Sequence, residues 1–370
     1  MTTEALNAIA LSALFGHRPE QLKQLYLRAG SATEIMNNAA DLQAIIPDLN
    51  AQFARIDGDS LRIAQEHARK EAEFIESHGV RVLVMNDGGY PVRLREVCPD
   101  APLVLYWHGN ADLNSTYMLS IVGTRNSTDY GRQMTERIVA DLAVAFPELI
   151  IVSGLAYGTD FNAHRAALDN NLATVGVLAH GLDRIYPSAH SNTAKKMLRR
   201  GGLISEYRSG VAPERHNFLR RNRIIAALSE ATIVVESKVR GGSLTTARLA
   251  NDYNLAVMAV PGRATDTASA GCNNLIAANG AQLITSTADI VKYLGWQPTE
   301  QHSPTLPSLF DNDLSAEERL VFSHLSAEPM HFSAIVAATS LPVPATLSVL
   351  SELEFRGLAH QLPGSKWRRG

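Results

Sequence analysis

The segment 216–229 carries the residue types with the most definite chemistry in this sequence, because three arginines surround an asparagine and follow an aromatic residue. Guanidinium groups are permanent cations that bind phosphate oxygens through two parallel donors. An apolar run follows at 232–236, and a glycine-hydroxyl turn at 241–246 comes next. Cations beside turn amides favour phosphate over a small neutral ligand. The candidate contact residues of the segment are Phe218, Arg220, Arg221, Asn222 and Arg223.

Three glycine-containing turns supply further candidate donors, because each lies between an apolar run and a predicted helix. Gly123 allows a sharp turn, and Thr124, Ser127 and the amides that open the next helix can donate to an anion. The first turn matches neither GxGxxG nor GxxxxGK[ST], so it predicts neither a dinucleotide site nor a P-loop. The candidate contact residues of the three turns are Gly123, Thr124, Arg125, Ser153, Gly154, Gly158, Gly241, Gly242, Ser243 and Thr245.

One glycine-hydroxyl turn is weak evidence, but three turns at successive strand ends predict a continuous phosphate-binding face. Such a repeated series suits a single-stranded nucleic acid better than a mononucleotide. Phe218 and Tyr157 offer aromatic faces on which bases could stack, although packing in the core is an equally good interpretation of each ring.

Residue types that would support catalysis or metal binding are scattered. Asp160 and His164 are four residues apart, but a helix cap and a helix-surface histidine are the simpler interpretation. No GxSxG turn accompanies them. The remaining acids near strand ends and the two cysteines match no metal-ligand spacing; they are Asp183, Glu206, Glu236, Cys98 and Cys272. We therefore predict no catalytic residue, no metal and no cofactor.

The elements that must position these residues alternate between apolar strands and amphipathic helices from residue 80 onward. Near-continuous apolar strands with helical crossovers predict a Rossmann-like, doubly wound, mostly parallel α/β sheet, whose ligands bind outside the carboxyl ends of the strands. The predicted strands are 80–85, 103–107, 118–122, 149–152, 173–178, 202–206, 232–236, 255–260 and 282–285. The predicted helices between them are 131–145, 159–170, 188–200, 219–229, 243–253, 272–279 and 287–294.

Four segments follow from the composition along the chain. Helical periodicity without a strand signal makes 1–78 a small helical domain, and 79–296 is the Rossmann-like domain. Residues 297–313 contain three prolines with Ser, Thr and Gln, and so predict a linker. Three helices and a polar hairpin make 314–370 a winged-helix domain.

The composition is that of a globular protein, with 370 residues, 45% hydrophobic and 19% charged. The formal net charge of −3 means that nucleic-acid binding must come from a local basic patch. No basic region begins the chain and no apolar run is long enough to span a bilayer, so we expect neither a signal peptide nor a membrane span. Two distant cysteines favour a reducing cytoplasm.

Ordered along most of the chain, several short motifs together resemble the DNA-processing protein A family (DprA, also called Smf). Each piece is weak alone, but their order is very specific. The pieces are Tyr90-Pro91, 102–106 with Gly109-Asn110, 121–125 with Tyr130-Gly131, 153–156 with Gly158, Asp160 and Ala163-His164, 181–183 with Tyr186-Pro187, 205–207, 220–229, 242–247, 260–262 and 271–276.

The resemblance implies a cytoplasmic protein that binds single-stranded DNA without strong sequence preference, protects it and loads the recombinase RecA onto it during natural transformation. No catalytic turnover belongs to that role. The resemblance also implies a SAM-like N-terminal helical domain and a homodimer formed by the last part of the Rossmann-like domain. The interface residues that it implies are Leu275, Ile276, Leu283 and Ile290.

The sequence departs from the family pattern at a few positions. Tyr157 and Thr159 stand where the family often has a basic or polar residue and an isoleucine, and Leu219 replaces a common proline. Ala179-His180 precedes Gly181 where small residues are more usual. These differences place individual contacts in doubt but not the family.

Two other functions stay open on the sequence alone. A nucleotide-processing enzyme of the phosphoribohydrolase type is favoured by the phosphate cradle and the nearby acids, but the PGGxGTxxE signature is missing and 260–263 does not replace it. A duplex-DNA regulator acting through the winged helix is disfavoured because 345–353 carries Glu352 as its one charge. A protein-contact role suits that helix better.

Overall fold

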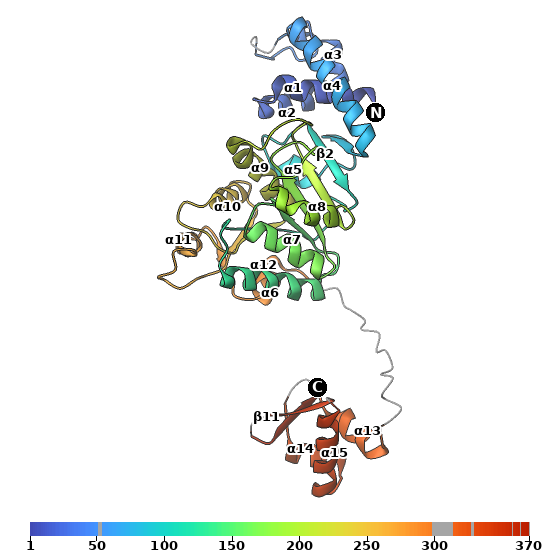
Figure 1. Ribbon diagram of the computed structural model, residues 1–370, viewed down its shortest axis with the longest axis vertical. Helices are drawn as coiled ribbons and strands as arrows, with labels where there is room; N and C mark the ends of the chain where they lie inside the picture. The colour runs from blue at the N-terminus through green and yellow to red at the C-terminus, as the bar shows by residue number, and fades with distance from the viewer. Residues whose placement is uncertain (51–53, 298–313, 327–328, 357, 363, 370) are drawn as a thin grey trace. The chain divides into compact units, whose positions relative to one another are not determined.

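The computed structural model describes all residues except 51–53, 298–313, 327–328, 357, 363 and 370. The chain forms two compact units, Met1–Thr299 and Glu300–Gly370 (Figure 1). The predicted linker 297–313 lies outside the described residues except for Gln297. The predicted boundary between 1–78 and 79–296 falls inside the first unit and stays a prediction.

The N-terminal segment is helical, as its periodicity predicts. The Thr2 hydroxyl caps the first helix by accepting from Ala5 N at 3.2 Å, and Gly30 and Gly79 end two helices in the left-handed conformation. The apolar faces of these helices join the core that continues under the first two strands. The elements are α1 (Thr3–Phe15), α2 (Pro19–Ala29), α3 (Ala32–Asn37), η1 (Leu42–Ala44) and α4 (Gly58–His78).

A nine-stranded sheet forms the centre of the first unit, in the order β1-β2-β6-β5-β4-β3-β7-β8-β9. The first two strands pair antiparallel, β2 also meets β6 antiparallel, and the pairs from β6 to β9 are parallel. The predicted mostly parallel α/β fold is therefore confirmed. The strands are β1 (Arg81–Val84), β2 (Val104–Gly109), β3 (Met118–Val122), β4 (Ile150–Ser153), β5 (Ala173–Leu178), β6 (Gly201–Ser205), β7 (Ala231–Val234), β8 (Ala256–Ala259) and β9 (Gln282–Leu283).

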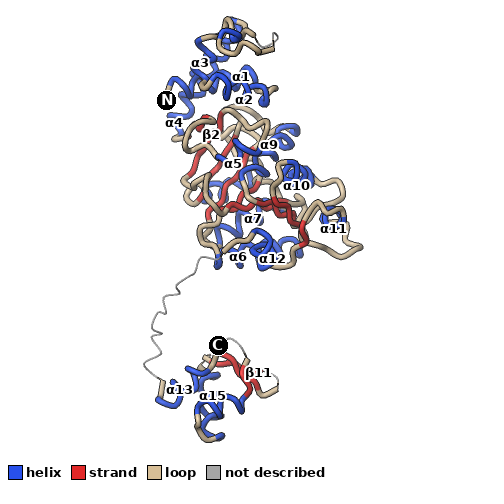
Figure 2. Tube along the Cα trace, turned by 180° about the vertical axis from the view of Figure 1, so that it is seen from behind, coloured by secondary structure: helices blue, strands red, loops and turns tan. Residues whose placement is uncertain are grey.

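Helices cover both faces of this sheet, because its strands are apolar on both sides. On one face α6 packs against α7 and α12, and on the other α9 packs against α10 and α5 (Figure 2). The helices are α5 (Val92–Val97), α6 (Asp129–Ala145), α7 (Thr159–Asp169), η3 (Ser188–His190), α8 (Ser191–Met197), α9 (Arg215–Leu228), α10 (Gly242–Asp252), α11 (Ala270–Ala277) and α12 (Thr287–Leu294).

The strand order reverses direction between β3 and β7, since successive βα units extend from β3 toward β6 on one side and from β7 toward β9 on the other. Ligands of open parallel sheets bind at such a switch point, outside the carboxyl ends of the strands. The turns after β3, β4 and β7, which contain the glycine-hydroxyl motifs, lie at this edge.

The C-terminal unit combines three helices with a three-stranded antiparallel sheet of order β10-β12-β11, which is a winged-helix arrangement. The hydroxyl of Ser315 and the carboxylate of Glu318 form a capping box at its first helix. Its elements are α13 (Ala316–His324), β10 (Met330–His331), α14 (Phe332–Thr339), α15 (Val343–Phe355), β11 (Ala359–Leu362) and β12 (Lys366–Arg369).

Among the described residues, no single helix is both long enough and apolar enough to cross a membrane. The helices α14 and α15 pass that test of length and composition when taken together, with a bend of 110° between them.

Candidate nucleic-acid interface

The turn after β3 is closed by a carboxylate from the neighbouring strand end. The Glu236 side chain, 1% exposed, accepts hydrogen bonds from Thr128 N at 2.9 Å, the Thr128 hydroxyl at 2.5 Å and the Ser127 hydroxyl at 3.3 Å. A negative charge at the start of α6 is stabilised by the helix dipole. This corrects the expectation that Ser127 and the amides opening α6 receive an external anion, because a phosphate there would face a buried carboxylate.

Arg125 is the exposed cation of the same turn. Its guanidinium lies 5.4 Å from the centroid of the Phe218 ring, a cation–π distance, and the Tyr186 ring lies 5.8 Å from Phe218. The amide of Thr124 is already bound to Glu236 O at 2.8 Å. The switch point therefore presents a guanidinium group and two aromatic rings.

The turn after β4 is pressed against the turn after β3. The Ser153 hydroxyl is fully buried and donates to Ile121 O at 2.6 Å, so the expectation that it contacts a ligand is wrong. Gly158 has φ +75°, and a Cβ atom there would lie 2.2 Å from Thr124 O. Only glycine fits this position, because the two turns meet backbone to backbone.

The Arg221 side chain is buried against the sheet and does not face solvent. Its side chain is 3% exposed, and Nη1 donates to Gly154 O at 2.8 Å and also to Val177 O. Burial lowers the pKa of Arg221 to about 10, and the carboxyl of Asp160 opposes that shift. The prediction that Arg221 and Gly154 contact phosphate is wrong for this structure, since both are buried and bind one another.

Arg220 and Arg223 of α9 are also engaged within the protein. Arg223 is buried, and its Nε and Nη2 atoms lie 2.7 Å from the carboxylates of Asp100 and Glu206, so it cannot reach a phosphate as predicted. Arg220 donates to Gly16 O at 2.6 Å and lies 3.3 Å from Glu206, while part of its side chain remains exposed. Asn222 is half-buried beside Arg221, whose Nε donates to it at 3.3 Å.

The turn after β7 leaves two cations exposed that sequence reasoning missed, Lys238 and Arg240. Their position between the end of an apolar strand and the Gly241-Gly242 pair is the signal that could have identified them. Gly242 is exposed at the start of α10, and Thr245 is half-buried one turn further along. Ser243 is buried and donates to the Ser237 hydroxyl at 3.0 Å, so its predicted ligand contact is wrong.

The Asp160–His164 pair is built into the protein interior. His164 is fully buried, with Nδ1 2.7 Å from the Thr174 hydroxyl, and burial lowers its pKa to about 3. Asp160 accepts from Ala156 N at 3.4 Å, and burial raises its pKa while Arg221 opposes the shift. Within the described ranges, no cluster of three or more His, Cys, Asp or Glu side chains could hold a metal ion.

The residues implied for a dimer interface differ in their burial. Leu283 is 42% exposed, and Leu275 and Ile276 are half-buried. Ile290 is fully buried in the core of its own chain, so its implied role in an interface is wrong.

These features define a class: a Rossmann-like α/β protein whose switch point carries cations and aromatic rings, joined to a winged-helix unit. The family model "DNA recombination-mediator protein A" matches residues 81–295, and the "DprA winged helix domain" model matches 303–365. The chain belongs to the DprA family.

Relatives from distant bacteria match most of the chain. The putative DNA processing protein DprA of Mycobacterium tuberculosis (strain H37Rv) is 38% identical over 319 residues, covering 82% of this chain and 80% of that protein. Protein Smf of Escherichia coli (strain K12) is 35% identical over 320 residues, covering 83% and 84%.

Two solved structures share the fold. DNA processing protein A from Streptococcus pneumoniae superimposes with a TM-score of 0.64 at 31% identity, covering 79% of this chain and 98% of that one. The Helicobacter pylori protein, described for its single-stranded DNA binding mode, gives a TM-score of 0.53 at 29% identity, covering 60% and 97%.

Proposed function

We propose that this protein binds single-stranded DNA along the carboxyl edge of its sheet, without strong sequence preference. The observation that carries the proposal is the Arg125 guanidinium over the Phe218 ring at the switch point, with Tyr186 against the same ring. A guanidinium group holds the phosphate while an aromatic face stacks a base, and this combination accepts any base because every base has a π-face. The single-stranded DNA binding mode described for the Helicobacter pylori relative supports the proposal.

The track extends beyond Arg125 because the strand order β5-β4-β3-β7-β8 sets the turns in a row. Four intervals of about 4.8 Å give a track of roughly 20 Å. Exposed cations follow β5, β3, β7 and β8 in this row, and they are Arg184, Arg125, Lys238, Arg240 and Arg263. Of the predicted contact residues, those that keep exposed or half-buried surface are Gly123, Thr124, Arg125, Gly158, Phe218, Arg220, Asn222, Gly241, Gly242 and Thr245.

Tyr157 supplies a second aromatic face on the same edge. Its side chain is 51% exposed, and its ring meets the His190 ring edge-on at 4.9 Å, while His190 stacks on Phe161 at 4.3 Å. Because half of its side chain is exposed, Tyr157 keeps surface for a base and would stack one in addition to Phe218.

Competition between strands tests this proposal directly. A labelled oligonucleotide bound to the full-length protein is challenged with unlabelled single-stranded or duplex DNA of the same sequence. Single strands should displace it at a much lower concentration, and a protein with both Arg125→Ala and Phe218→Ala should lose most of its affinity. Preference for duplex DNA, or unchanged affinity of the double variant, would reject the proposed track.

Delivery of the DNA to the RecA recombinase, in the cytoplasm and during natural transformation, completes the proposal. The protein would protect incoming strands and act without catalytic turnover. The test measures RecA filament formation on DNA coated with a single-strand binding protein, with and without this protein. A faster start of filament growth is expected, and no change in that rate would reject the delivery step.

We further propose a homodimer formed through the exposed and half-buried apolar residues Leu275, Ile276 and Leu283. An exposed leucine beside half-buried neighbours at the sheet edge is suited to pairing between two copies. Sedimentation equilibrium should give a dimer for the wild type and a monomer for Leu283→Glu. A wild-type monomer at micromolar concentration would rule this assembly out.

The nucleotide-processing alternative loses its main support in the structure. The start of α6, where an enzyme of this fold would hold a phosphate, is bound to the Glu236 carboxylate. Incubation with nucleoside monophosphates, followed by chromatography for free base, should detect no turnover.

A further inference from the structure

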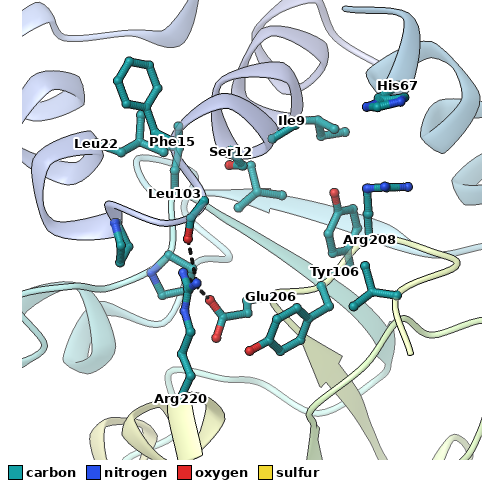
Figure 3. A pocket seen from close by; sticks show the side chains of 17 residues that line it. Ile9, Ser12, Phe15, Leu22, His67, Leu103, Tyr106, Glu206, Arg208 and Arg220 are labelled. Atoms are coloured by element: carbon teal, nitrogen blue, oxygen red, sulfur yellow. Dashed lines mark hydrogen bonds and ion pairs between the residues drawn. The ribbon is translucent and has the colours of Figure 1, made fainter. Parts of the chain in front are cut away.

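A cavity of about 210 Å³ lies in the first unit, between the N-terminal helices and the sheet. Figure 3 shows the side chains from α1, α2, β2 and the segment after β6 that surround it. Most of its wall is apolar and includes Ile9, Leu22 and Leu103, while the rings of Phe15 and Tyr207 are half-buried and keep some surface. An engineered cavity of about 150 Å³ holds benzene in another protein, so this one has room for an aromatic ring system.

The segment after β6, which lines this cavity, packs against the turn after β5. Gly181 N donates to Val211 O at 3.1 Å. Gly210 N donates to Asp183 Oδ1 at 3.0 Å, and the next residue, Arg184, is the exposed cation at this end of the proposed DNA track. The cavity therefore adjoins the track, which one further interval of about 4.8 Å extends from β5 to β6.

The charged side chains that line the cavity and keep exposed surface include two arginines. Arg208, on the segment after β6, is exposed, and 31% of the Arg220 side chain is exposed. The Glu206 carboxylate also lines the cavity, but its side chain is 4% exposed and pairs with both Arg220 and Arg223. A phosphate group that approaches Arg208 from solvent thus meets a guanidinium group and not the buried carboxylate.

A helix of the N-terminal segment holds the backbone beside Arg208 in place. The Glu71 carboxylate of α4 is 3% exposed and accepts from Ser209 N at 2.9 Å and from the Ser209 hydroxyl at 2.5 Å. Hydrogen bonds to a buried carboxylate are strong, so the residue next to Arg208 is fixed. The cavity and its cation are therefore formed in advance of any ligand.

We propose that this cavity takes one base of the bound single strand, while Arg208 holds the phosphate beside that base. The proposal rests on the proposed DNA function and adds a base-binding site at the β6 end of the track. Burial of the two faces of a base against apolar walls is favourable, and the half-buried rings offer stacking surface. Every base has such faces, so the site accepts any sequence.

Ala13→Phe tests the cavity, because Ala13 lines it from an exposed position on α1 and a phenyl group there would take up the space. Fluorescence anisotropy with the full-length protein gives the affinity for dT strands of about 4 to 16 nucleotides, the usual range of site sizes. Strands long enough to reach the cavity should bind the variant about five-fold or more weakly. The shortest strands, which can bind within the rest of the track, should lose much less.

A control and a second blocking variant accompany this test. Ala337→Phe makes the same change at an exposed position on α14 and should match the wild type at every strand length. If Ala13→Phe does not fold, Val211→Phe at a half-buried position that lines the cavity takes its place.

Abasic residues distinguish the base from its phosphate. They are placed at both ends of the shortest strand that shows the difference between wild type and blocking variant. Because the phosphates remain and the terminal bases are removed, the two proteins should then bind with equal affinity.

Arg208→Ala tests the phosphate contact. On strands that reach the cavity, the slope of log affinity against log salt should fall by about 0.7. Arg199→Ala removes an exposed arginine that precedes β6 and so lies at the opposite edge of the sheet, and it should leave the slope unchanged.

Three results would overturn the proposal. The first is equal affinity of wild type and the folded blocking variant at every strand length. The second is a difference between them that persists with abasic ends, and the third is an unchanged salt slope in Arg208→Ala. A wild-type protein that binds no single-stranded DNA would instead refute the proposed function itself.

Discussion

The guanidinium of Arg221 donates to the carbonyl oxygen of Gly154 at 2.8 Å, and this contact ties helix α9 to the turn after β4. The same Nη1 atom also donates to Val177 O at the end of β5. Phe218 lies one helical turn before Arg221 on α9 and meets Arg125 across the switch point. A buried arginine thus holds the helix that presents the aromatic ring, although it contacts no ligand itself.

Replacing Arg221 should lower the stability of the fold, because its side chain binds within the protein and not to a DNA phosphate. Arg221→Ala removes the hydrogen bonds to two buried carbonyl groups and the cation near buried Asp160, and we expect a loss of about 2–4 kcal/mol in the free energy of unfolding. Arg165→Ala, which removes an ion pair with Glu136 between partly exposed side chains, should cost less than about 1 kcal/mol. Urea unfolding followed by circular dichroism measures both. Unchanged stability with a smaller salt dependence of DNA binding would instead assign Arg221 to phosphate.

Arg125→Ala should weaken single-stranded DNA binding to a similar degree for all sequences. Removing one phosphate contact lowers the slope of log affinity against log salt by about 0.7 for single strands. Arg137→Ala, an exposed position on α6, should leave both affinity and slope unchanged. Fluorescence anisotropy at four salt concentrations gives the slope. If Arg125→Ala and wild type share one slope, Arg125 does not contact phosphate.

Phe218→Leu separates stacking from charge, because it keeps an apolar side chain and removes the ring. Base stacking on an aromatic side chain contributes about 1–3 kcal/mol, so affinity should fall by about five-fold or more. The salt slope should stay at the wild-type value, since no cation is removed. An equal affinity in Phe218→Leu would mean that the ring serves packing alone.

Lys238 and Arg240 should extend the phosphate track past the switch point. The double variant Lys238→Ala/Arg240→Ala should reduce the salt slope by about 1.4, twice the value for one contact on single strands. Lys195→Ala/Lys196→Ala removes two exposed cations from the last turn of α8 and serves as the matched control. A larger effect of the α8 pair would place the DNA elsewhere.

Acid should destabilise the fold partly through His164. Its pKa is lowered from 6.5 to about 3 by burial, so between these values the unfolded chain binds a proton that the folded chain refuses. The free energy of unfolding therefore rises with pH across this window, and the contribution of His164 to it is complete above pH 6.5. His164→Asn keeps a polar amide beside the Thr174 hydroxyl. The free energy of unfolding of this variant should depend on pH less steeply than that of the wild type, by about 1.4 kcal/mol per pH unit between pH 6 and 4.

Two neighbouring groups do not disturb that comparison. Burial lowers the pKa of His180, which acts in the same direction, and raises that of Asp160, which acts in the opposite direction. Both are present in wild type and variant, so they cancel in the difference. Urea unfolding at four pH values measures the difference in the free energy of unfolding between the two proteins. If that difference does not change with pH, His164 has the same pKa in the folded and the unfolded chain.

Local sequence determined the architecture of this protein. Apolar runs separated by amphipathic helices lead to one parallel sheet, because such strands must be covered on both faces. The observed strand Met118–Val122 has the predicted bounds, and Ala173–Leu178 does as well. The position of the glycine turns at strand ends also follows from the sequence, since βα turns lie at one edge of such a sheet.

Only the tertiary structure decided which of those residues face a ligand. Successive residues of a helix point about 100° apart, so Arg220 and Arg223, three residues apart, share one side of α9 and both pair with Glu206, while Arg221 points to Gly154. Packing of α9 on the sheet buried two of them and directed the third toward Gly16, while Arg125 stayed exposed. Residue type gives the charge of a side chain, but its direction depends on contacts with Asp100, Gly154 and Glu206, which are distant in sequence.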